Sequence, residues 1–389
     1  MTTILHITAD FPDALNPHKT LAVKRLIRAA TWATNIVVSM NRVVTPSPAK
    51  TLELDEDGVV SMAYFGLPWG VGLSLWMQRT AERIAAMVER RGLEVDLIHA
   101  HKLTFEGLVA ERLSELLGVP YCVTVRGHTD HRVVWAKPGL RRHYRRIVHG
   151  AARVFFLAPW SRARLADQLS LAPDFGGLLP NTCSPRPNPV VDAPCNGRLI
   201  SPFHFRSRRV KNIAVVFDAI RMLRADGIIV GLDVVGAANA AELESMHQLA
   251  TKHGVASLVE AKMAMPNEAL LGALPSYAGL VLPSYPETFG LAYLEALQAG
   301  IPVIHAKNSG IDGFFQAQRI VRAVDHRDQR ALAESIRQLV GNYTELRYEV
   351  RRFVAEGGLA AFSPASVDKH YRFELQSIPT AAREATCTQ

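Results

Sequence analysis

Short apolar runs rich in β-branched residues alternate with amphipathic stretches along the chain. In its first half, the runs that predict strands are 4–8, 36–40, 95–101 and 121–125. The stretches between them that predict helices are 20–34, 79–91 and 106–117. Near-continuous apolar strands joined by helices are typical of a parallel sheet that is covered on both faces. We therefore expect such a sheet here.

The same alternation returns in the second half. Its predicted strands are 198–202, 231–236, 279–283 and 302–305. Its predicted helices are 212–225, 242–253, 290–299, 330–340 and 363–375. Two such series predict an α/β chain with two Rossmann-like, doubly wound domains in tandem. Ligands of such folds bind outside the carboxyl ends of the strands, so we expect the domains to face a cleft there.

A proline-rich stretch separates the two series. Residues 179–194 carry five prolines and no hydrophobic period, which is typical of a linker. The expected organisation has four parts. They are a first domain over 1–185, a linker over 186–197, a second domain over 198–360, and a C-terminal helix and tail over 361–389.

The longest uncharged run, 58–78, is long enough to cross a bilayer. Glycines and a proline interrupt it, so we interpret it as a loop followed by the start of a helix. The N-terminus lacks the basic and apolar regions of a signal peptide. The cysteines at 122, 183, 195 and 387 are scattered, without metal-ligand spacing or a disulfide framework. We expect a cytoplasmic protein.

The net charge of +8 is local. Residues 126–164 hold nine Arg and one Lys against Asp130 alone, and the rest of the chain is close to neutral. Such a distribution disfavours a protein that coats nucleic acid along its length, and no nucleic-acid-binding module is recognisable.

The most informative stretch is Val281–Ile304, in which a strand, a turn with Glu287 and a helix start near Gly290 follow one another. Backbone N–H groups at a helix start can face a phosphate, and glycine allows close approach. Glu287, and Glu295 two turns later, could accept hydrogen bonds from paired hydroxyls of a sugar or ribose.

This string resembles the EX7E signature of retaining GT-B glycosyltransferases, family 4 (group 1) in particular, including its framing by Phe289, Gly290 and Leu291. The resemblance runs from Ile4 to Tyr371. It implies a GT-B fold whose second domain binds a nucleotide-diphosphate sugar and whose last helix crosses back to the first domain. Glu287 would contact the sugar, Glu295 the ribose, and Thr288 to Leu291 the donor through the backbone.

Arg206 and Lys211 match the Arg-x4-Lys element that holds the donor diphosphate in this family. A guanidinium and an ammonium can stabilise a departing pyrophosphate, so we expect neither a metal nor another cofactor.

In the first domain, the segment from Asp96 to His128 resembles the family's histidine-containing element, but with departures. Arg126 stands where the family has a catalytic His, and His128 follows two residues later. Either could take that role. His99 and His101 are interpreted as strand-end histidines that support loops.

Two further departures concern loops of the first domain. Thr20 stands where the family's glycine-rich loop is usual, and Thr182 follows Asn181 where a Gly is typical.

Basic and aromatic residues interleave in 126–164, around Arg141, Arg142, Arg145 and Arg146. This pattern suits an anionic lipid surface on the acceptor side, and the alternative is a solvated helix face. The resemblance implies an enzyme that moves a sugar to a lipid-linked or saccharide acceptor in bacterial surface polysaccharide synthesis, with peripheral association at the inner membrane. The alternatives are a nucleotide-sugar 2-epimerase and a non-catalytic GT-B protein that binds a nucleotide sugar or a membrane.

Overall fold

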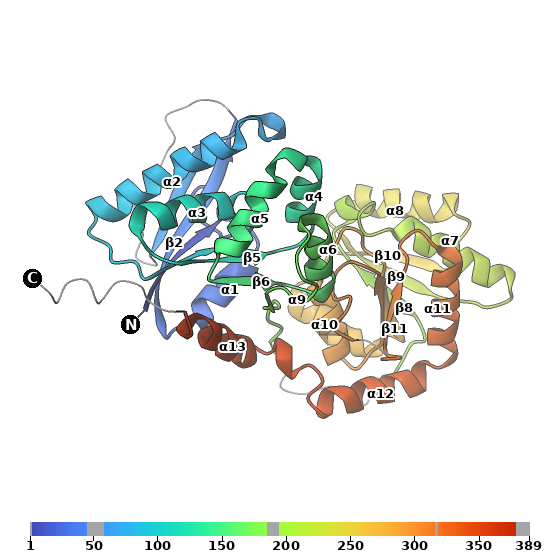
Figure 1. Cartoon of the computed structure of the whole chain (residues 1–389). Helices are drawn as coiled ribbons and strands as arrows, with labels where there is room; N and C mark the ends of the chain where they lie inside the picture. Colours follow the sequence, from blue (N-terminus) through green and yellow to red (C-terminus); the bar gives the residue numbers. More distant parts are fainter. Residues whose placement is uncertain (1, 45–57, 185–193, 316–317, 379–389) are drawn as a thin grey trace, which may run out of the picture. The chain divides into compact units, whose positions relative to one another are not determined.

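The computed structural model describes residues 2–44, 58–184, 194–315 and 318–378 (Figure 1). Most of the expected linker 186–197 and the tail after 378 lie outside these ranges. The chain forms two compact units. Unit 1 comprises Met1–Leu157, Ser161–Thr182 and Pro364–Gln389, and unit 2 comprises Ala158–Trp160 and Cys183–Ser363.

Unit 1 contains a seven-stranded sheet in the order β3-β2-β1-β4-β5-β6-β7, and all its strand pairs are parallel. The strands are β1 (Thr2–Thr8), β2 (Ala33–Val43), β3 (Val59–Phe65), β4 (Leu97–Ala100), β5 (Tyr121–Val125), β6 (Arg153–Phe156) and β7 (Gly177–Leu178). The helices are α1 (Ala22–Ala29), α2 (Leu73–Arg90), α3 (Glu106–Leu117), α4 (His128–Ala136), α5 (Arg141–Gly150), α6 (Pro159–Leu169) and α13 (Pro364–Gln376), with short 3-10 turns η1 (Pro68–Gly70) and η2 (Pro138–Leu140).

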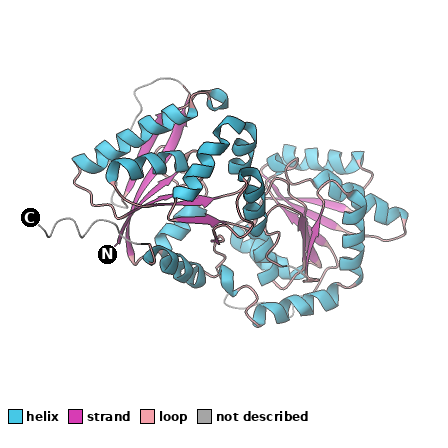
Figure 2. Ribbon diagram, in the orientation of Figure 1, coloured by secondary structure: helices cyan, strands magenta, loops and turns pink. Residues whose placement is uncertain are grey.

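Helices cover both faces of this sheet (Figure 2). Successive strand residues point to opposite faces, so Leu5 and Ile7 pack with α2, α3 and α5 while Ile4 packs with α1 and α13. The last helix is fixed to unit 1 by polar contacts as well. The indole of Trp32 donates to Asp368 at 2.9 Å, and Arg153 forms an ion pair with Glu374 at 2.9 Å.

Unit 2 contains a six-stranded parallel sheet in the order β10-β9-β8-β11-β12-β13. The strands are β8 (Leu199–Pro202), β9 (Leu232–Ala237), β10 (Val259–Met263), β11 (Gly279–Leu282), β12 (Val303–Ala306) and β13 (Val321–Val324). The helices are α7 (Ile213–Ala225), α8 (Ala240–Lys252), α9 (Asn267–Ala273), α10 (Leu291–Gln298), α11 (Gln329–Gly341) and α12 (Tyr343–Ala355), and the 3-10 turns are η3 (Phe205–Ser207), η4 (Leu274–Ser276) and η5 (Ala360–Phe362).

The expected fold class, with two parallel-sheet Rossmann-like α/β domains, is confirmed. The interpretation of 58–78 was wrong in its first part. Residues Val59–Phe65 form the edge strand β3, and only then do a loop and α2 follow. β3 pairs with β2 and most of its residues are buried, so pairing with a neighbour turned a mixed apolar run into a strand.

Candidate functional site

In unit 2 the predicted donor residues gather at the carboxyl edge of the sheet. The chain leaves β11 at Leu282, passes through Glu287 and enters α10 at Leu291. Lys211 lies in the loop that precedes α7, and it forms an ion pair with Glu287, with Nζ and Oε2 2.5 Å apart. Both side chains remain about one-fifth exposed, so a ligand in the solvent can reach them.

The backbone fixes the position of Glu287. Its N–H donates to the hydroxyl of Ser309 at 2.8 Å, and its carbonyl accepts from Gly310 N at 2.9 Å. The other carboxylate oxygen accepts from the N–H of Thr288 at 3.1 Å. The Gly310 N–H is thus used within the loop. Asp312 likewise caps the loop by accepting from Asn308 N.

Gly290 is required where α10 begins. Its φ of 77° is left-handed, and a Cβ added to it would lie 2.3 Å from the ring of Tyr293. Phe289 has a buried side chain that packs against Phe314 and Phe362, so only its backbone can face a ligand. Thr288 and Leu291 are both partly exposed beside the helix start.

Arg206 lies apart from the Lys211–Glu287 pair in its contacts. It belongs to η3, is 82% exposed, and pairs with Glu242 at 3.2 Å. Glu242 also accepts from Ala238 N, while its own N–H donates to the side chain of Asn239. This is a capping arrangement at the start of α8. Glu242, which Arg206 contacts, is thus held in place, while most of the Arg206 side chain is exposed to solvent.

A cavity of about 290 Å³ adjoins this edge of the sheet, close to the lower limit of the size range of small-molecule sites. Its lining includes the ends of β8 and β9, and Glu295 reaches it from α10. The other lining residues are largely apolar and are Pro202, Phe203, His204, Val235, Gly236, Ala264, Met265, Asn267, Leu270, Leu274, Leu280 and Ala292. Gly236 allows the close packing, because a Cβ there would overlap the carbonyl of Phe203.

In unit 1, Arg126 and His128 follow β5 directly. Arg126 is buried and its guanidinium donates to the side chain of Asn181 at 3.0 Å. Burial lowers its pKa against the opposing effect of nearby carboxylates, yet a guanidinium stays charged in proteins. Burial, assisted by Arg164, lowers the pKa of His128 to about 4, so this ring is neutral at neutral pH.

The sequence reasoning missed a buried polar cluster beside Arg126. Lys102 pairs with Asp10 at 2.7 Å, and Glu106 accepts from Ala9 N at 2.7 Å. Burial, opposed by Lys102, raises the pKa of Glu106 to about 8, and its Oε2 has no hydrogen-bond partner in the described part of the chain. Asp130 accepts from Thr104 and from Arg126 N. An acid at the start of the helix that follows a buried strand was the available signal.

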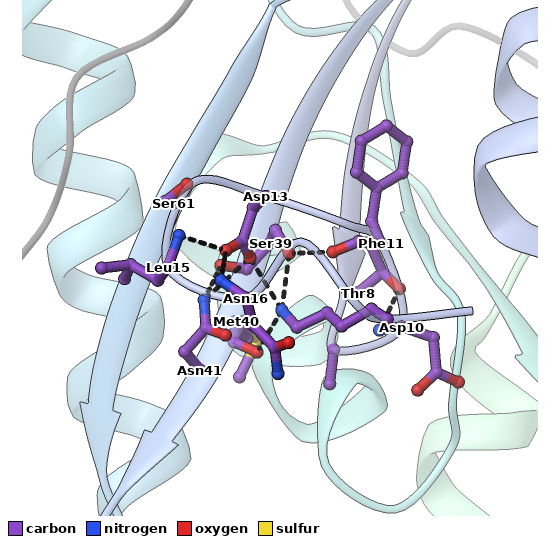
Figure 3. Close-up of polar contacts among 12 residues, drawn as sticks. Thr8, Asp10, Phe11, Asp13, Leu15, Asn16, Ser39, Met40, Asn41 and Ser61 are labelled. Atoms are coloured by element: carbon purple, nitrogen blue, oxygen red, sulfur yellow. Dashed lines mark hydrogen bonds and ion pairs between the residues drawn. The ribbon is translucent and has the colours of Figure 1, made fainter. Parts of the chain in front are cut away.

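The loop after β1, where Thr20 replaces a glycine-rich loop, is held by side chains (Figure 3). Asp13 accepts from the backbone of Leu15 and Asn16 with one oxygen, and from Asn41 and Lys19 with the other. Burial alone would raise the pKa of Asp13, but hydrogen bonds, above all from Lys19, hold it below the usual value. Thr20 itself is exposed and accepts only weakly from Ala22 N, at 3.4 Å.

Three buried histidines, His6, His99 and His101, bring nitrogens within 4.8 Å of one another, which a metal ion could use. Their hydrogen bonds fit a neutral chain instead. The amide of Asn35 donates to three carbonyls, so its oxygen accepts from His6 Nε2. His6 Nδ1 then accepts from His101 Nε2 at 3.1 Å.

His99 completes this cluster by bonding to Tyr371 at 2.6 Å and to Thr124 at 2.8 Å. Burial lowers the pKa of all three rings, that of His6 to about 4. A metal would have to break these bonds. The cluster joins β1, β4, β5 and α13, so His99 and His101 support strands and a helix, where the sequence had led us to expect support of loops.

Several cations of the basic strip 126–164 have partners within unit 1. Arg146 pairs with Glu111, Arg153 with Glu374, and Arg141 donates to the carbonyl of Val134. Arg142 and Arg145 are exposed and have no ion pair or hydrogen bond within the described residues. In the ranges described, no helix is both long and apolar enough to cross a bilayer.

Comparison with known proteins covers both units. The family model described as "Glycosyl transferase 4-like domain" matches residues 24–182, and "Glycosyl transferases group 1" matches residues 196–354. A D-inositol 3-phosphate glycosyltransferase of Arthrobacter sp. is 30% identical over 56% of this chain and 55% of its own length. The match thus spans about half of that relative. One from Corynebacterium urealyticum is 24% identical over 77% of this chain and 76% of its own.

Solved structures share the fold over nearly the whole chain. Sucrose-phosphate synthase from Thermosynechococcus elongatus is 19% identical with a TM-score of 0.70, covering 97% of this chain and 98% of its own. Anabaena HepE in complex with UDP is 14% identical with a TM-score of 0.67, covering 97% and 100%. The two family models together match most of both sheets, and the solved structures share the fold. The chain therefore belongs to the group 1 glycosyltransferase family.

Proposed function

We propose that the protein is a retaining glycosyltransferase that moves a sugar from a nucleotide-diphosphate sugar to a lipid-linked or saccharide acceptor in bacterial surface polysaccharide synthesis. The observation that supports the proposal is the Lys211–Glu287 pair at the same edge of the sheet as the cavity that Glu295 lines. At one sheet edge, an ammonium suits a phosphate, a carboxylate suits sugar hydroxyls, and a mostly apolar cavity suits a nucleoside.

The donor is expected to lie along this edge. The nucleoside would occupy the 290 Å³ cavity with its ribose hydroxyls on Glu295. The diphosphate would take Lys211 from Glu287 and draw in the exposed guanidinium of Arg206. Glu287 would then accept from the sugar hydroxyls. That Anabaena HepE was solved with UDP and with UDP-glucose makes a uridine nucleotide a reasonable first donor to test.

The reaction that fits this arrangement is a front-face displacement. The bond between the anomeric carbon and the phosphate oxygen breaks while the acceptor oxygen bonds to the same face of that carbon. The acceptor's proton passes to the departing phosphate oxygen. Lys211 and Arg206 stabilise the charge that develops on the diphosphate, and for that reason we propose that the transfer needs no metal.

In unit 1, Arg126 and His128 are proposed as catalytic residues. Arg126 is a fixed cation because burial and Asn181 hold it in place. His128 is neutral and can therefore donate or accept a hydrogen bond at neutral pH. We further propose peripheral association with the inner membrane through Arg142 and Arg145.

Substitution of Glu287 tests the site. In Glu287→Ala, we expect sugar transfer to fall about 100-fold or more while the circular dichroism spectrum is unchanged. Glu244→Ala, which removes an exposed carboxylate from α8, is the matched control and should transfer normally. Near-normal transfer by Glu287→Ala would contradict the assignment. Donor turnover without any acceptor would instead indicate an epimerase, and donor binding without transfer a non-catalytic binding protein.

A further inference from the structure

Unit 1 contains a larger cavity, of about 400 Å³, that the proposed donor site does not use. It lies at the carboxyl edge of the sheet, because Tyr64 and Gly66 lie at the end of β3 and Phe105 precedes α3. The rest of the lining comes from Arg42 near the end of β2, the loop 67–71, the start of α2, and the second half of α4 with Lys137 after it. Carboxyl edges are where ligands of parallel sheets bind.

The lining of this cavity is apolar with a positively charged rim. Its apolar members are Tyr64, Leu67, Trp69, Val71, Leu73, Trp76, Met77, Phe105, Val133 and Ala136. Its charged members are Arg42, Arg132 and Lys137, and none of the lining residues is acidic. Paired hydroxyls of a sugar are usually bound by carboxylates. The cavity therefore suits an apolar ligand with an anionic group better than a saccharide.

The three cations have N–H groups that make no hydrogen bond in the described part of the chain. Arg42 donates to the carbonyls of Gly66 and Leu67, and Lys137 donates to the carbonyl of Gly70 at 3.0 Å. Those contacts use two of the five N–H donors of Arg42 and one of the three of Lys137. Arg132 is exposed and makes no hydrogen bond or ion pair within the described ranges. An anionic oxygen at the rim could thus receive several charge-assisted bonds.

One exposed tryptophan lines the cavity, and another is adjacent in sequence to a lining residue. Trp69 lines it and yet is 92% exposed, and Val71 beside it is 59% exposed. Trp135, next to Ala136 on α4, is 68% exposed. Trp69 also has a φ of 57°, which is unfavourable for a bulky residue. A strained, exposed tryptophan beside an apolar cavity indicates a binding surface, and tryptophan is the residue that prefers the membrane–water interface.

We propose that this cavity binds the apolar chain of a phosphate-bearing membrane lipid, whose phosphate contacts Arg132, Lys137 and Arg42. The tryptophans 69 and 135 then lie in the headgroup layer. Binding of the lipid requires no catalysis. A second step, in which the same lipid is the sugar acceptor, rests on the transferase activity proposed above. This step would narrow the acceptor class to lipid phosphates.

Calorimetric titration with short-chain phosphatidic acid, below the concentration at which it forms micelles, tests the site directly. Short-chain phosphatidylcholine and inorganic phosphate are the comparison ligands. We expect phosphatidic acid to bind at least about tenfold more tightly than phosphatidylcholine, because only its phosphate group is free of a positive headgroup. Inorganic phosphate, which has no chain, should not bind measurably. Equal binding of the two lipids, or binding of neither, would overturn the proposal.

Two variants localise the binding. Ala136→Trp fills the cavity and should abolish it, and Arg132→Gln with Lys137→Gln should weaken it about tenfold or more. Ala225→Trp, an equal change at an exposed position of α7, is the control. Unchanged affinity in Ala136→Trp would contradict the site. Nucleotide-sugar binding, measured on the same samples, checks folding. If the lipid binds but no sugar is transferred to it, the lipid site is supported and only its role as the acceptor site is contradicted.

Discussion

Lys211 and Glu287 neutralise each other in the absence of a donor, with 2.5 Å between Nζ and Oε2. Because both are partly exposed, this pair contributes little to stability, and a diphosphate can compete for the lysine. Arg206, by contrast, is 82% exposed and, among the described residues, pairs with Glu242 alone. The two cations therefore differ in how firmly they are placed before the donor arrives.

This difference leads to a prediction for the two cations. Lys211→Ala should lower transfer about 100-fold, since it removes a preplaced cation and leaves Glu287 unpaired. Arg206→Ala should lower it less, because ordering a solvated side chain on the donor offsets part of its contribution. Steady-state kcat and KM for each variant check this, with Lys252→Ala on α8 as the control. A larger loss in Arg206→Ala than in Lys211→Ala would contradict the interpretation.

Glu106 gives unit 1 a pH dependence. Its pKa is about 8 in the folded protein, above the ordinary value of an unfolded chain, so its neutral form is favoured by folding. Its contribution to stability is complete below the unfolded pKa and is lost as the pH rises through about 8. Glu106→Gln, which stays neutral, should lose less stability than the natural protein on going from pH 6 to pH 9.

Thermal unfolding across this pH range measures the effect. The variant's Tm should exceed that of the natural protein at pH 9 by about 2 °C or more, with a smaller difference at pH 6. Glu115→Gln, an exposed change on the same helix, should show no such trend. A difference in Tm that is constant with pH would mean that Glu106 is ionised in the fold throughout.

At the scale of elements, the loop after β1 is stabilised by one buried carboxylate. Asp13 and Lys19 are almost fully buried and 2.7 Å apart, and Asp13 also bonds to the loop backbone. Asp13→Ala would leave the ammonium of Lys19 buried without its counter-charge. We expect a loss of about 3 kcal/mol in the free energy of unfolding.

Denaturant titration of unit 1 checks this loss, with Asp174→Ala in an exposed loop as the control. Adding Lys19→Met to Asp13→Ala should restore part of the stability, because the unpaired charge is then removed as well. If Asp13→Ala alone unfolds at the same denaturant concentration as the natural protein, the loop is held by other contacts.

The elements that the sequence predicted best are those with strong local signals. α3 begins and ends where expected, since Glu106 opens it and Gly118 adopts a left-handed φ of 70° after it. β6 and β7 were missed as well as β3, β10 and β13. Of these strands, β10 and β13 mix charged with apolar residues, and β3 was hidden by the glycines that follow it. Their state is decided by pairing with a neighbouring strand, which local sequence does not reveal.

The candidate site was predictable to the same degree. The motif placed Glu287 before a helix start and Glu295 on that helix, as found. It did not reveal that Lys211 pairs with Glu287, because 76 residues separate them. Nor did it reveal the cluster around Glu106, whose bond to Ala9 spans 97 residues. Contacts between distant strand ends arise from topology, not from spacing in the sequence.

At the scale of the whole molecule, the cations that give the net charge of +8 lie in different environments. Part of the basic excess of 126–164 is used inside unit 1, where Arg146 and Arg153 pair with acids and Arg126 is buried. Arg142 and Arg145 remain exposed on α5. These exposed cations, together with Arg132 on α4, can act on an anionic surface.

We therefore predict that Arg142→Ser with Arg145→Ser weakens sedimentation with vesicles of phosphatidylcholine and phosphatidylglycerol about tenfold or more at low salt, because each charge near the surface contributes about 1 kcal/mol. Arg221→Ser with Arg224→Ser, which changes the net charge equally on α7, is the control. If both double variants weaken binding equally, only the total charge matters. If neither weakens it, the basic face of α5 is a solvated helix face without a role in membrane binding.

Donor binding tests the central claim most directly. Calorimetric titration with UDP, GDP, ADP and dTDP sugars should show that at least one nucleotide sugar binds the natural protein. Binding should be lost in Ala292→Trp, because Ala292 lines the 290 Å³ cavity assigned to the nucleoside. If none of the four classes binds, or if Ala292→Trp binds its donor as tightly as the natural protein, the assignment of this site to a nucleotide sugar is wrong.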